Sequence, residues 1–525
     1  MENWFYAQAE LKKPAEIDIL YAGMQLAHDE GFTGMVFHAP ELSHPQIEGA
    51  AFRRLCRDIR ARCTALGLKF FVSVATACAA RGLLWANPEC AASQRCEGYY
   101  VVKNGDLVPV KSEQVVLPSI EDEGYWWFEE PCNGPRSYDS AAAIKLTDFD
   151  KAPKGCARFS PRGGVAVLPN RHLIASVEVK LEDFPASHIG NVQISIRGHC
   201  RVGKRDLVLN LPRLDPDNAD WQWLAVSFNT LDCERIDLTC GIWEVPTQGT
   251  VWMREPQIEP AGFWHTIPDS VRAVDRAGAE VDLLDGGGWG FLGDWGKQPV
   301  PCSARTTDYL TEGDRLFIRH RHAVQVKGGQ LNLDLESKRG MELVRQQIEW
   351  VAPVMDPDGW VICNSTENRA GDYDNPAKAL ARNIDFCAET IGAVDPGKPI
   401  IVWADNLDPY HNGGDGFQGL IPQYAPFEGA YNLLAEATRR AIIPINWSPR
   451  EPESSIHWVQ LGCRQVKSLN TGGKWQGQYA EWIKAVRDPK RPIPGIIAVL
   501  ATNWNGGAMR YEPLAEFAAA TKGGA

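Results

Sequence analysis

"SKRGMELVRQQIEWVAPVMDPDGWVICNS", residues 337 to 365, reads as an amphipathic helix that leads through a short turn into a buried strand. The apolar positions of the helix recur at three-and-four spacing: Met341, Val344, Ile348 and Val351. This spacing places them on one helix face, and the apolar run 359–363 after the turn has the length of a strand. A helix that precedes a fully apolar strand is typical of parallel sheets covered by helices. We therefore expect an α/β fold.

The same alternation of strand and helix occurs at both ends of the chain. Asn375 followed by Pro376 has the signature of a helix start, an N-cap followed by proline at the first helical position. Eight segments read as parallel strands: 3–10, 32–39, 68–76, 359–365, 399–405, 441–447, 464–470 and 495–503. Eight parallel strands with intervening helices predict a closed (β/α)8 TIM barrel. The run 315–324 is interpreted as an accessory strand.

Between the third and fourth of these strands the periodicity changes to strict alternation. Short segments such as 192–196 and 236–242 place an apolar residue at every second position, with turns between them. Such a series predicts an antiparallel β-sandwich of jelly-roll type. We assign residues 1–124 to the first part of the barrel and 125–262 to the inserted sandwich. The remainder of the barrel is 263–525, with an accessory segment at 263–335.

The amino-acid composition argues against some classes of binding partner. A formal net charge of -12 and the absence of a basic stripe argue against nucleic acid or a membrane surface. With no apolar run of eighteen residues we expect a soluble chain, and the compartment is left open. The fourteen cysteines contain no Cys-x-x-Cys pair, so most should be buried thiols, with one or two disulfides left open.

No cofactor or metal is expected from the motifs. His320 and His322 lie on one side of a predicted strand and could ligate a metal. No acidic residue or cysteine near them in the sequence completes a ligand set, so hydrogen bonding is the expected role.

The candidate site consists of polar residues that close the predicted barrel strands, because active sites of such barrels lie at the C-terminal strand ends. Glu367 and Asp405 follow neighbouring strands and are the predicted catalytic pair. Burial near the apolar Trp360 and Trp403 would raise the pKa of Glu367. The residues predicted to contact the substrate are His38, Glu41, His322, Thr366, Arg369, Trp403, Asp408, His411, Asn446, Trp447, Lys467, Asn470 and Trp504.

Paired carboxylates beside tryptophan walls are what glycosidic bond cleavage requires. One carboxylic acid protonates the leaving oxygen, and the second acts at the anomeric carbon or on its water. A single acidic residue at a strand end is more often a helix cap or an ion-pair partner, as Glu367 could be for Arg369. The functional interpretation rests on the concurrence of polar residues at six strand ends.

The order of the motifs in the second half resembles β-N-acetylhexosaminidase-like glycoside hydrolases over about residues 312–512. The motifs are "GWVICNSTENR", "KPIIVWADNLDPYHN", "IIPINWS", "GCRQVKSLNT" and "PGIIAVLATNW". The resemblance implies that Glu367 is the general acid and that Trp403, Asp405 and Trp504 line the sugar pocket. Thr366 stands where this superfamily has the Asp that orients the substrate acetamido group. A neutral hydroxyl cannot stabilise the developing charge as a carboxylate does, so a different second carboxylate is implied. Asp405 is the first choice, with Glu41, Asp408 and Glu10 behind it.

We therefore predict a glycosidase, exo-acting on an oligosaccharide or glycoconjugate, with a carbohydrate substrate as its partner. The inserted sandwich resembles a carbohydrate-binding module, and a homodimer contact through it is left open. Four of its tryptophans could form a sugar platform or belong to the core: Trp221, Trp223, Trp243 and Trp252. The alternatives are a catalytically silent sugar-binding protein and a carbohydrate lyase that uses Lys467 or His322 as its base.

Overall fold

The structure is a computed structural model of the 525-residue chain, and it describes most of its length. Residues outside the description are 1, 44–48, 76–83, 85–86, 111–114, 130–134, 139–140, 148–154, 202, 209–213, 216, 285–304, 307–309, 327–329, 364–370, 412–426, 448–452, 471–492, 494, 503–510, 512 and 523–525. The chain forms two compact units, residues 1–90 with 331–525 and residues 91–330. The sequence-based boundaries differ from this division, since 91–124 and 263–330 fall in the second unit.

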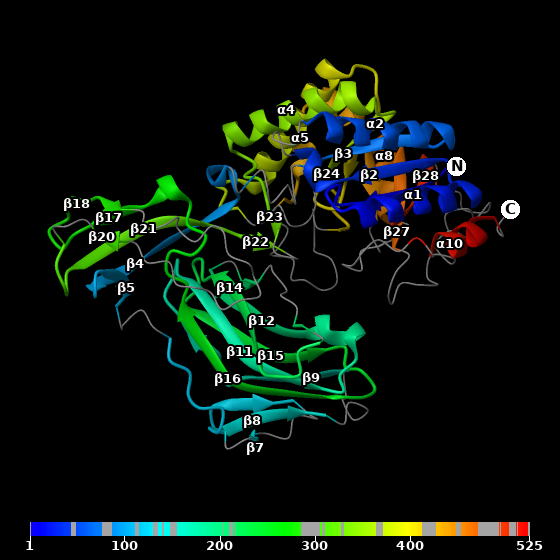
Figure 1. The fold of residues 1–525 in the computed structure, drawn as a ribbon. Coiled ribbons are helices and arrows are strands. Elements are labelled where there is room, and N and C mark those ends of the chain that lie inside the picture. Colours follow the sequence, from blue (N-terminus) through cyan, green and yellow to red (C-terminus); the bar gives the residue numbers. More distant parts are fainter. Residues whose placement is uncertain are drawn as a thin grey trace. The chain divides into compact units, whose positions relative to one another are not determined.

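A closed barrel of eight parallel strands forms the first unit (Figure 1). Its strands follow one another around the ring in chain order: β1 (Glu2–Gln8), β2 (Gly34–His38), β3 (Lys69–Ala75), β24 (Gly359–Cys363), β25 (Ile400–Trp403), β26 (Ile442–Asn446), β27 (Gln465–Asn470) and β28 (Ile496–Thr502). All eight predicted strands are confirmed, with ends within two residues of the prediction. The pairing of β1 with β28 closes the ring.

Helices alternate with these strands along the chain: α1 (Pro14–Asp29), α2 (Ala50–Ala65), α4 (Lys338–Met355), α5 (Pro376–Val394), α6 (Ala430–Leu433), α7 (Glu436–Ala441), α8 (Glu453–Gln460) and α10 (Pro513–Lys522). Between β25 and β26 the helical segment is divided in two, because the chain is extended at Leu434 between α6 and α7. On α4 the predicted stripe is buried except Met341, with Leu343 buried in its place.

Alternate residues of the barrel strands fill its interior. Trp4 and Tyr6 of β1, Val361 of β24 and Trp403 of β25 belong to one apolar cluster with residues of the other strands. Trp360 points the other way, and its Nε1 donates a hydrogen bond to Asp395 Oδ2 at the end of α5, 3.0 Å away. Trp360 and Trp403 therefore lie on opposite faces of the sheet, because a period-two strand turns neighbouring side chains to opposite sides. Glu367, which both were expected to surround, lies outside the described residues.

Asp358 joins three elements where the chain enters β24. Its carboxylate forms a bidentate ion pair with Arg60 of α2, at 3.0 and 3.2 Å, and accepts the backbone N–H of Phe70 in β3 at 2.8 Å. Gly359 comes next, and a Cβ on this residue would lie 2.8 Å from the Phe71 ring and 2.9 Å from the Pro399 carbonyl oxygen. Only glycine allows this close approach between the strands.

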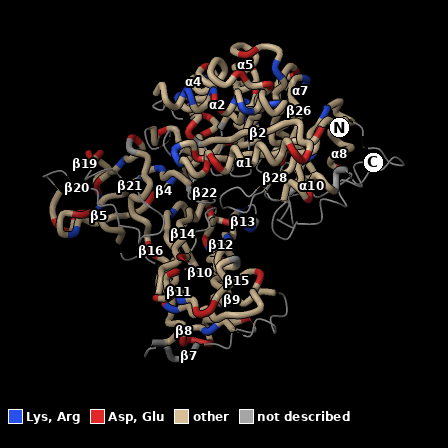
Figure 2. Tube along the Cα trace, turned by 45° about the vertical axis from the view of Figure 1, so that its right-hand side comes forward, with Lys and Arg blue, Asp and Glu red and all other residues tan. Residues whose placement is uncertain are grey.

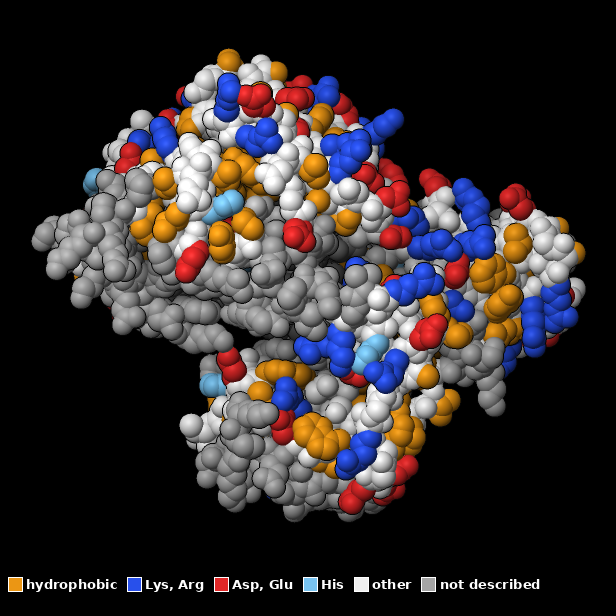
Figure 3. Space-filling model, turned by 180° about the vertical axis from the view of Figure 1, so that it is seen from behind, with side chains coloured by type: hydrophobic (Ala, Val, Ile, Leu, Met, Phe, Trp, Pro, Cys, Tyr) orange, Lys and Arg blue, Asp and Glu red, His pale blue; other side chains and the backbone are white. Residues whose placement is uncertain are grey.

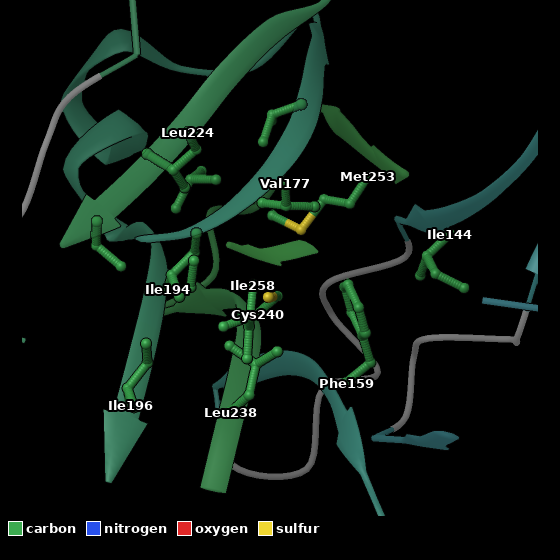
Figure 4. Packing of buried hydrophobic residues seen from close by; sticks show 14 of the residues in the cluster. Ile144, Phe159, Val177, Ile194, Ile196, Leu224, Leu238, Cys240, Met253 and Ile258 are labelled. Carbon is green, nitrogen blue, oxygen red and sulfur yellow. The ribbon is translucent and has the colours of Figure 1, made fainter. Parts of the chain in front are cut away.

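Two antiparallel sheets in the second unit form the predicted sandwich. One sheet has the order β13 (Gly203–Asp206), β12 (Val192–Cys200), β15 (Arg235–Trp243), β9 (Cys156–Pro161) and β6 (Trp126–Phe128), with β10 (Val165–Ala166) beside β15. The other has the order β14 (Gln222–Asn229), β11 (His172–Glu182), β16 (Thr250–Pro260), β8 (Ala141–Leu146) and β7 (Pro135–Tyr138). Side chains from both sheets, among them Val177, Ile194 and Leu238, share one apolar core (Figure 4).

A third antiparallel sheet completes the second unit. Its order is β18 (Glu280–Val281), β17 (Arg272–Val274), β21 (Arg315–Ala323), β4 (Ser93–Lys103), β5 (Asp106–Pro109), β20 (Arg305–Thr306) and β19 (Leu283–Leu284). β21 is the predicted accessory strand, and β4 and β5 were not predicted. Two short strands, β22 (Gln325–Val326) and β23 (Gln330–Leu331), form a separate pair.

The states of the cysteines and the distribution of the charges agree with what the composition predicted. Cys200 and Cys233 form a disulfide, and nine other described cysteines are free, eight of them buried. Acidic and basic residues are interspersed along the described trace, and the face in Figure 3 mixes charged and hydrophobic side chains (Figures 2 and 3). Among the described residues, no helix has both the length and the apolar character needed to cross a lipid bilayer.

The N-cap of α5 gives a stability prediction. The Asn375 side chain accepts a hydrogen bond from the backbone N–H of Lys378 at 2.9 Å, as the sequence predicted. Replacing it by alanine (Asn375→Ala) should lower the free energy of unfolding by about 1 kcal/mol, because a helix donor loses its acceptor. Urea unfolding followed by the helical circular dichroism signal measures this, since all described α-helices lie in the first unit.

Asn375→Asp is the matched control, because aspartate caps about as well as asparagine. Equal stability of the alanine and aspartate variants would show that this cap contributes nothing measurable.

Candidate functional site

The C-terminal strand ends lie at one edge of the barrel, and several of the residues at this edge are described. Among them are Asn446, Trp447 and the turn 404–411 after β25, whereas Lys467 lies three residues before the end of β27. Thr366, Glu367, Arg369 and Trp504 lie outside the described residues, so their positions stay predictions. Asn470 ends β27, and its side chain is likewise outside the description.

The segment after β25 folds into successive turns that bury polar side chains. Backbone N–H groups of Leu407 and Asp408 both donate to the Ala404 carbonyl oxygen at 2.8 Å, and that of His411 donates to Asp408 at 3.0 Å. The side chains of Asp405, Asp408 and His411 are all buried, at 4%, 1% and 1% exposure. Burial of ionisable groups at a strand end is costly unless they are paired, which makes this turn the strongest described part of the candidate site.

Asp408 is held by hydrogen bonds. Ser454 Oγ at the start of α8 donates to its Oδ2, and the backbone N–H of Tyr410 donates to its Oδ1 at 2.8 Å. Burial raises the pKa of Asp408, and these two hydrogen bonds oppose the rise. Because both oxygens are engaged within the fold, Asp408 positions α8 against the turn and is a weaker choice for the second catalytic carboxylate than Asp405.

His411 carries a neutral ring in a buried position. Its ring lies 4.4 Å from that of Trp447, centroid to centroid, at the end of β26. Burial lowers the pKa of His411 to about 3, the positive charge of Lys467 acts in the same direction, and a hydrogen bond to the Asp405 backbone opposes both. A neutral imidazole can donate or accept a hydrogen bond to a neutral ligand.

Lys467 is a fully buried lysine in β27, 1% exposed, and it pairs with Asn446 at the end of β26. Its Nζ lies 3.5 Å from Asn446 Oδ1. The Asn446 amide nitrogen in turn donates to Ser455 Oγ and to Gln465 Oε1, both at 3.2 Å. This network joins the end of β26 to the first half of β27 on the sheet face toward α8, opposite to the interior residues of the barrel.

The end of β2 contributes His38 and Glu41. Both are buried, and one Glu41 oxygen, Oε1, accepts the backbone N–H of Lys12 at 3.4 Å. The other, Oε2, has no hydrogen-bond partner among the described residues. Glu10, the last carboxylate in the predicted order, is exposed and pairs with Lys13 at 2.9 Å. Glu41 is therefore better placed than Glu10 to face a ligand.

Tyr6 contacts residues of both β2 and β25, and the sequence did not predict it as a site residue. Its ring centroid lies 6.5 Å from that of His38, nearly parallel, and 6.1 Å from that of Trp403, edge-on. The signal was available, because Tyr6 is two residues after the inward-facing Trp4 on the same strand. Ser454, Ser455 and Gln465 were also missed, since short polar residues at helix starts and strand starts carry no distinctive pattern.

Contacts thus connect candidates from β2, β25, β26 and β27. His322 is not among them: it is 3% exposed, and its described contacts lie in the second unit, where its ring stacks on His172 at 3.7 Å. A cavity of about 610 Å³ lies at the opposite edge of the barrel, lined by residues that begin β26 and β27, such as Ile442 and Arg464. That edge holds none of the candidate residues.

The four sandwich tryptophans do not share one face. By strand register, Trp223 and Trp252 lie in the sheet of β14, β11 and β16, whereas Trp243 lies in the other sheet. The Arg254 guanidinium lies 4.0 Å from the Trp221 ring centroid. Trp252 is 8% exposed and donates its Nε1–H to Glu182 at 2.9 Å. The prediction of one platform made by all four rings is therefore wrong, because the strands that carry Trp243 and Trp252 belong to different sheets.

Neither a family profile nor a curated protein sequence matches the chain. Among solved structures, the xylan-binding domain of Paenibacillus barcinonensis Xyn10C aligns at 13% identity over 27% of this chain and 90% of its own, with a TM-score of 0.19. A carbohydrate-binding module specific for non-crystalline cellulose aligns at 11% identity over 28% and 94%, with a TM-score of 0.20.

Streptomyces plicatus N-acetyl-β-hexosaminidase aligns at 12% identity over 36% of this chain and 38% of its own, with a TM-score of 0.23. The matched part thus spans well under half of that enzyme. At such scores the likenesses carry no conclusion on activity, and the fold assignment rests on the strand pairing described above.

The buried His38 gives a pH prediction. Burial lowers its pKa from 6.5 to about 4 in the folded chain. As pH falls below 6.5 the unfolded chain takes up a proton that the folded chain does not, so stability is lost between those two values. In His38→Gln the loss of stability between about pH 7 and about pH 5 should be smaller than in the parent by up to about 2 kcal/mol.

Urea unfolding at the two pH values measures this difference. His28→Gln is the control, because it removes an exposed histidine from the last turn of α1. An unchanged pH dependence in His38→Gln would contradict the buried, neutral assignment.

Proposed function

We propose that the protein is a glycoside hydrolase built on a (β/α)8 barrel of the hexosaminidase-like kind. The observation that carries the proposal is the end of β25, where Trp403 and Asp405 are both buried at the C-terminal edge of a closed parallel barrel. In barrels of this kind that edge holds the active site. An aromatic wall beside a carboxylate suits the apolar face and the reacting centre of a sugar ring.

Glu367 and Asp405 are the proposed catalytic pair. Glu367 would protonate the leaving oxygen, and Asp405 would act at the anomeric carbon or activate a water. In the sequence the two residues follow β24 and β25, and the pairing of these strands over Trp360–Ile362 and Ile400–Val402 makes them neighbours in the ring, which supports the proposal. A separation of about 5 Å between the carboxyl groups would lead to retention, and one of about 6.5–9.5 Å to inversion.

Buried polar groups beside the pair would select the sugar. Glu41, whose Oε2 has no hydrogen-bond partner among the described residues, and the neutral His411 supply groups suited to bind hydroxyls. Thr366 cannot orient an acetamido group as a carboxylate would, so we propose a sugar without a participating N-acetyl group, cleaved from a chain end. In the second unit, we propose that Trp223 and the outward-facing side chains beside it on the same sheet form an accessory sugar contact.

One observation favours a second candidate. A lysine that is 1% exposed in β27, with an amide oxygen 3.5 Å from its Nζ, is the kind of group that serves as a base when its proton is lost. A lyase acting on an acidic sugar would use Lys467 in this way. Its products would carry a new carbon–carbon double bond, which a hydrolase does not form.

The first activity prediction concerns Glu367→Gln. The purified protein is screened against nitrophenyl glycosides and natural oligosaccharides, with binding followed in parallel. The variant should lose about 10²–10⁴-fold in kcat while it still binds sugar, because the amide cannot donate the proton. Glu349→Gln, an exposed position on α4, is the matched control and should retain the parent rate.

If the parent protein binds sugar without turning it over, it is a sugar-binding protein, and this result would contradict the glycosidase proposal.

A companion prediction separates the two chemistries. Asp405→Asn should reduce hydrolysis by at least about 10²-fold, the usual contribution of an acid–base group. Lys467→Met should weaken substrate binding and still allow residual hydrolysis. Unsaturated products that disappear in Lys467→Met and persist in Asp405→Asn would favour the lyase instead, and mass spectrometry of the products distinguishes the two outcomes.

A further inference from the structure

Three buried side chains of the metal-ligating kind meet in the second unit. Cys96 Sγ and one ring nitrogen each of His172 and His322 lie within 4.8 Å of one another. The exposures of the three residues are 2%, 6% and 3%. They come from different sheets, since β4 and β21 belong to the seven-stranded sheet and β11 to the sandwich.

Strand register explains the meeting. In the pairing of β4 with β21, Cys96 lies opposite His320, so His322 is its diagonal neighbour on the same face. His172 begins β11, and its ring stacks on that of His322 with centroids 3.7 Å apart and planes 9° apart. Residues that are far apart in the sequence are thus brought together by two separate ladders.

The hydrogen bonds around His322 determine which ring nitrogen carries a lone pair. The backbone N–H of Leu231 donates to Asn229 Oδ1 at 2.7 Å, which turns the Asn229 Nδ2 donor toward His322 Nε2, 3.1 Å away. Nε2 is therefore the acceptor, and Nδ1–H donates to the carbonyl oxygen of Ala323 at 3.2 Å. A backbone carbonyl that holds one ring N–H while the other nitrogen is free to bind is the usual support of a metal-ligating histidine.

His172 lacks hydrogen-bond partners. Both of its ring nitrogens are buried and have no partner among the described residues. Leaving such a group unsatisfied in the interior costs about 1–3 kcal/mol, which a bound ligand would recover. A cavity of about 20 Å³ is lined by Cys96 and His172, with His320 on its wall, and this volume holds one water-sized occupant.

We propose that Cys96, His172 and His322 form a binding site for a zinc ion, with a water molecule in the fourth position. Two nitrogens and one sulfur suit zinc and are unsuited to calcium or magnesium, which take oxygen ligands. Bond lengths of about 2.0–2.3 Å place the ligand atoms of tetrahedral zinc roughly 3.3–3.6 Å apart, whereas here they lie within 4.8 Å of one another. Zinc binding therefore requires the three side chains to move together and the stacked rings of His172 and His322 to turn, so that both lone pairs meet the ion.

Binding converts the Cys96 thiol to a thiolate and releases its proton to solvent. His322 Nε2 then exchanges its contact with Asn229 for the metal. The Asn229 amide, 3.3 Å from Cys96 Sγ and 2.9 Å from the Arg95 carbonyl oxygen, stays as a donor to the thiolate. The ion would fasten the seven-stranded sheet to the sandwich. This inference is independent of the proposed glycosidase activity.

The test uses the tag-free full chain, purified without reductant so that the Cys200–Cys233 disulfide stays closed. Zinc is measured by elemental analysis after dialysis, and cobalt(II) replaces it for spectroscopy. We expect one zinc per chain and a thiolate-to-cobalt charge-transfer band. Cys96→Ser should abolish the band, and His172→Gln and His322→Gln should each weaken zinc binding by more than the roughly 10-fold that loss of a second-shell partner costs.

Two control variants remove comparable groups elsewhere in the same unit. Cys240→Ser changes a buried thiol of the sandwich core, and His199→Gln changes a histidine paired with Asp237, so both should keep the metal. Cys200→Ser controls for the group of Cys200, Asp232 and Cys233, whose two sulfurs form the disulfide, and this variant too should keep the band. Because the band is read on the folded parent protein, a variant that fails to fold does not decide the outcome.

A folded parent chain that binds no zinc or shows no thiolate band would overturn the proposal. So would a band that survives in folded Cys96→Ser.

Discussion

The chain must return to β3 after an excursion of more than two hundred residues, and the barrel depends on this return. Phe71 of β3 pairs with Gly359 of β24, and only then can the four later strands complete the ring to β1. Asp358 fixes the junction through Arg60 and the Phe70 amide. Loop closure costs rise slowly with length, so a large insertion is tolerated if its two ends are held together in this way.

Closure of the ring has a chemical consequence. All eight strands are parallel, so their C-terminal ends share one edge, where polar residues from distant segments gather. There the fold buries Asp405, Asp408 and His411 instead of placing apolar residues. Buried ionisable groups lower the free energy of unfolding. A sequence that keeps several of them at one edge departs from the pattern of a stable core, and such departures are expected at functional sites. The glycosidase proposal draws on this concentration and not on distant structural likeness.

Local periodicity predicted most of the barrel. The apolar runs of β24 and β25 and the Asn375–Pro376 start of α5 are local signals, and the structure confirms them. The alternation of Ile194 with Ile196 and of Leu238 with Cys240 likewise predicted the sandwich core. Patterns of this kind depend on a few neighbouring residues, which is why they can be read without knowledge of the fold.

Features that depend on distant pairing were not predicted. β4 and β5 were missed because β4 owes its place to β21, far along the chain, and the Cys200–Cys233 bridge depends on neighbouring strands. Cys96 and His172 could not be joined to His322 for the same reason. In the barrel, the outward direction of Trp360 was not foreseen, because side chains on a fully buried strand carry no polar alternation that distinguishes the two faces.

The most direct test of the account is a crystal structure of the Glu367→Gln variant soaked with a mixture of oligosaccharides. The account predicts a sugar ring packed on Trp403, with its glycosidic oxygen beside residue 367 and its anomeric carbon near Asp405. Sugar bound solely to residues 91–330, with the barrel edge closed to it, would contradict the assignment of that edge as a glycosidase active site.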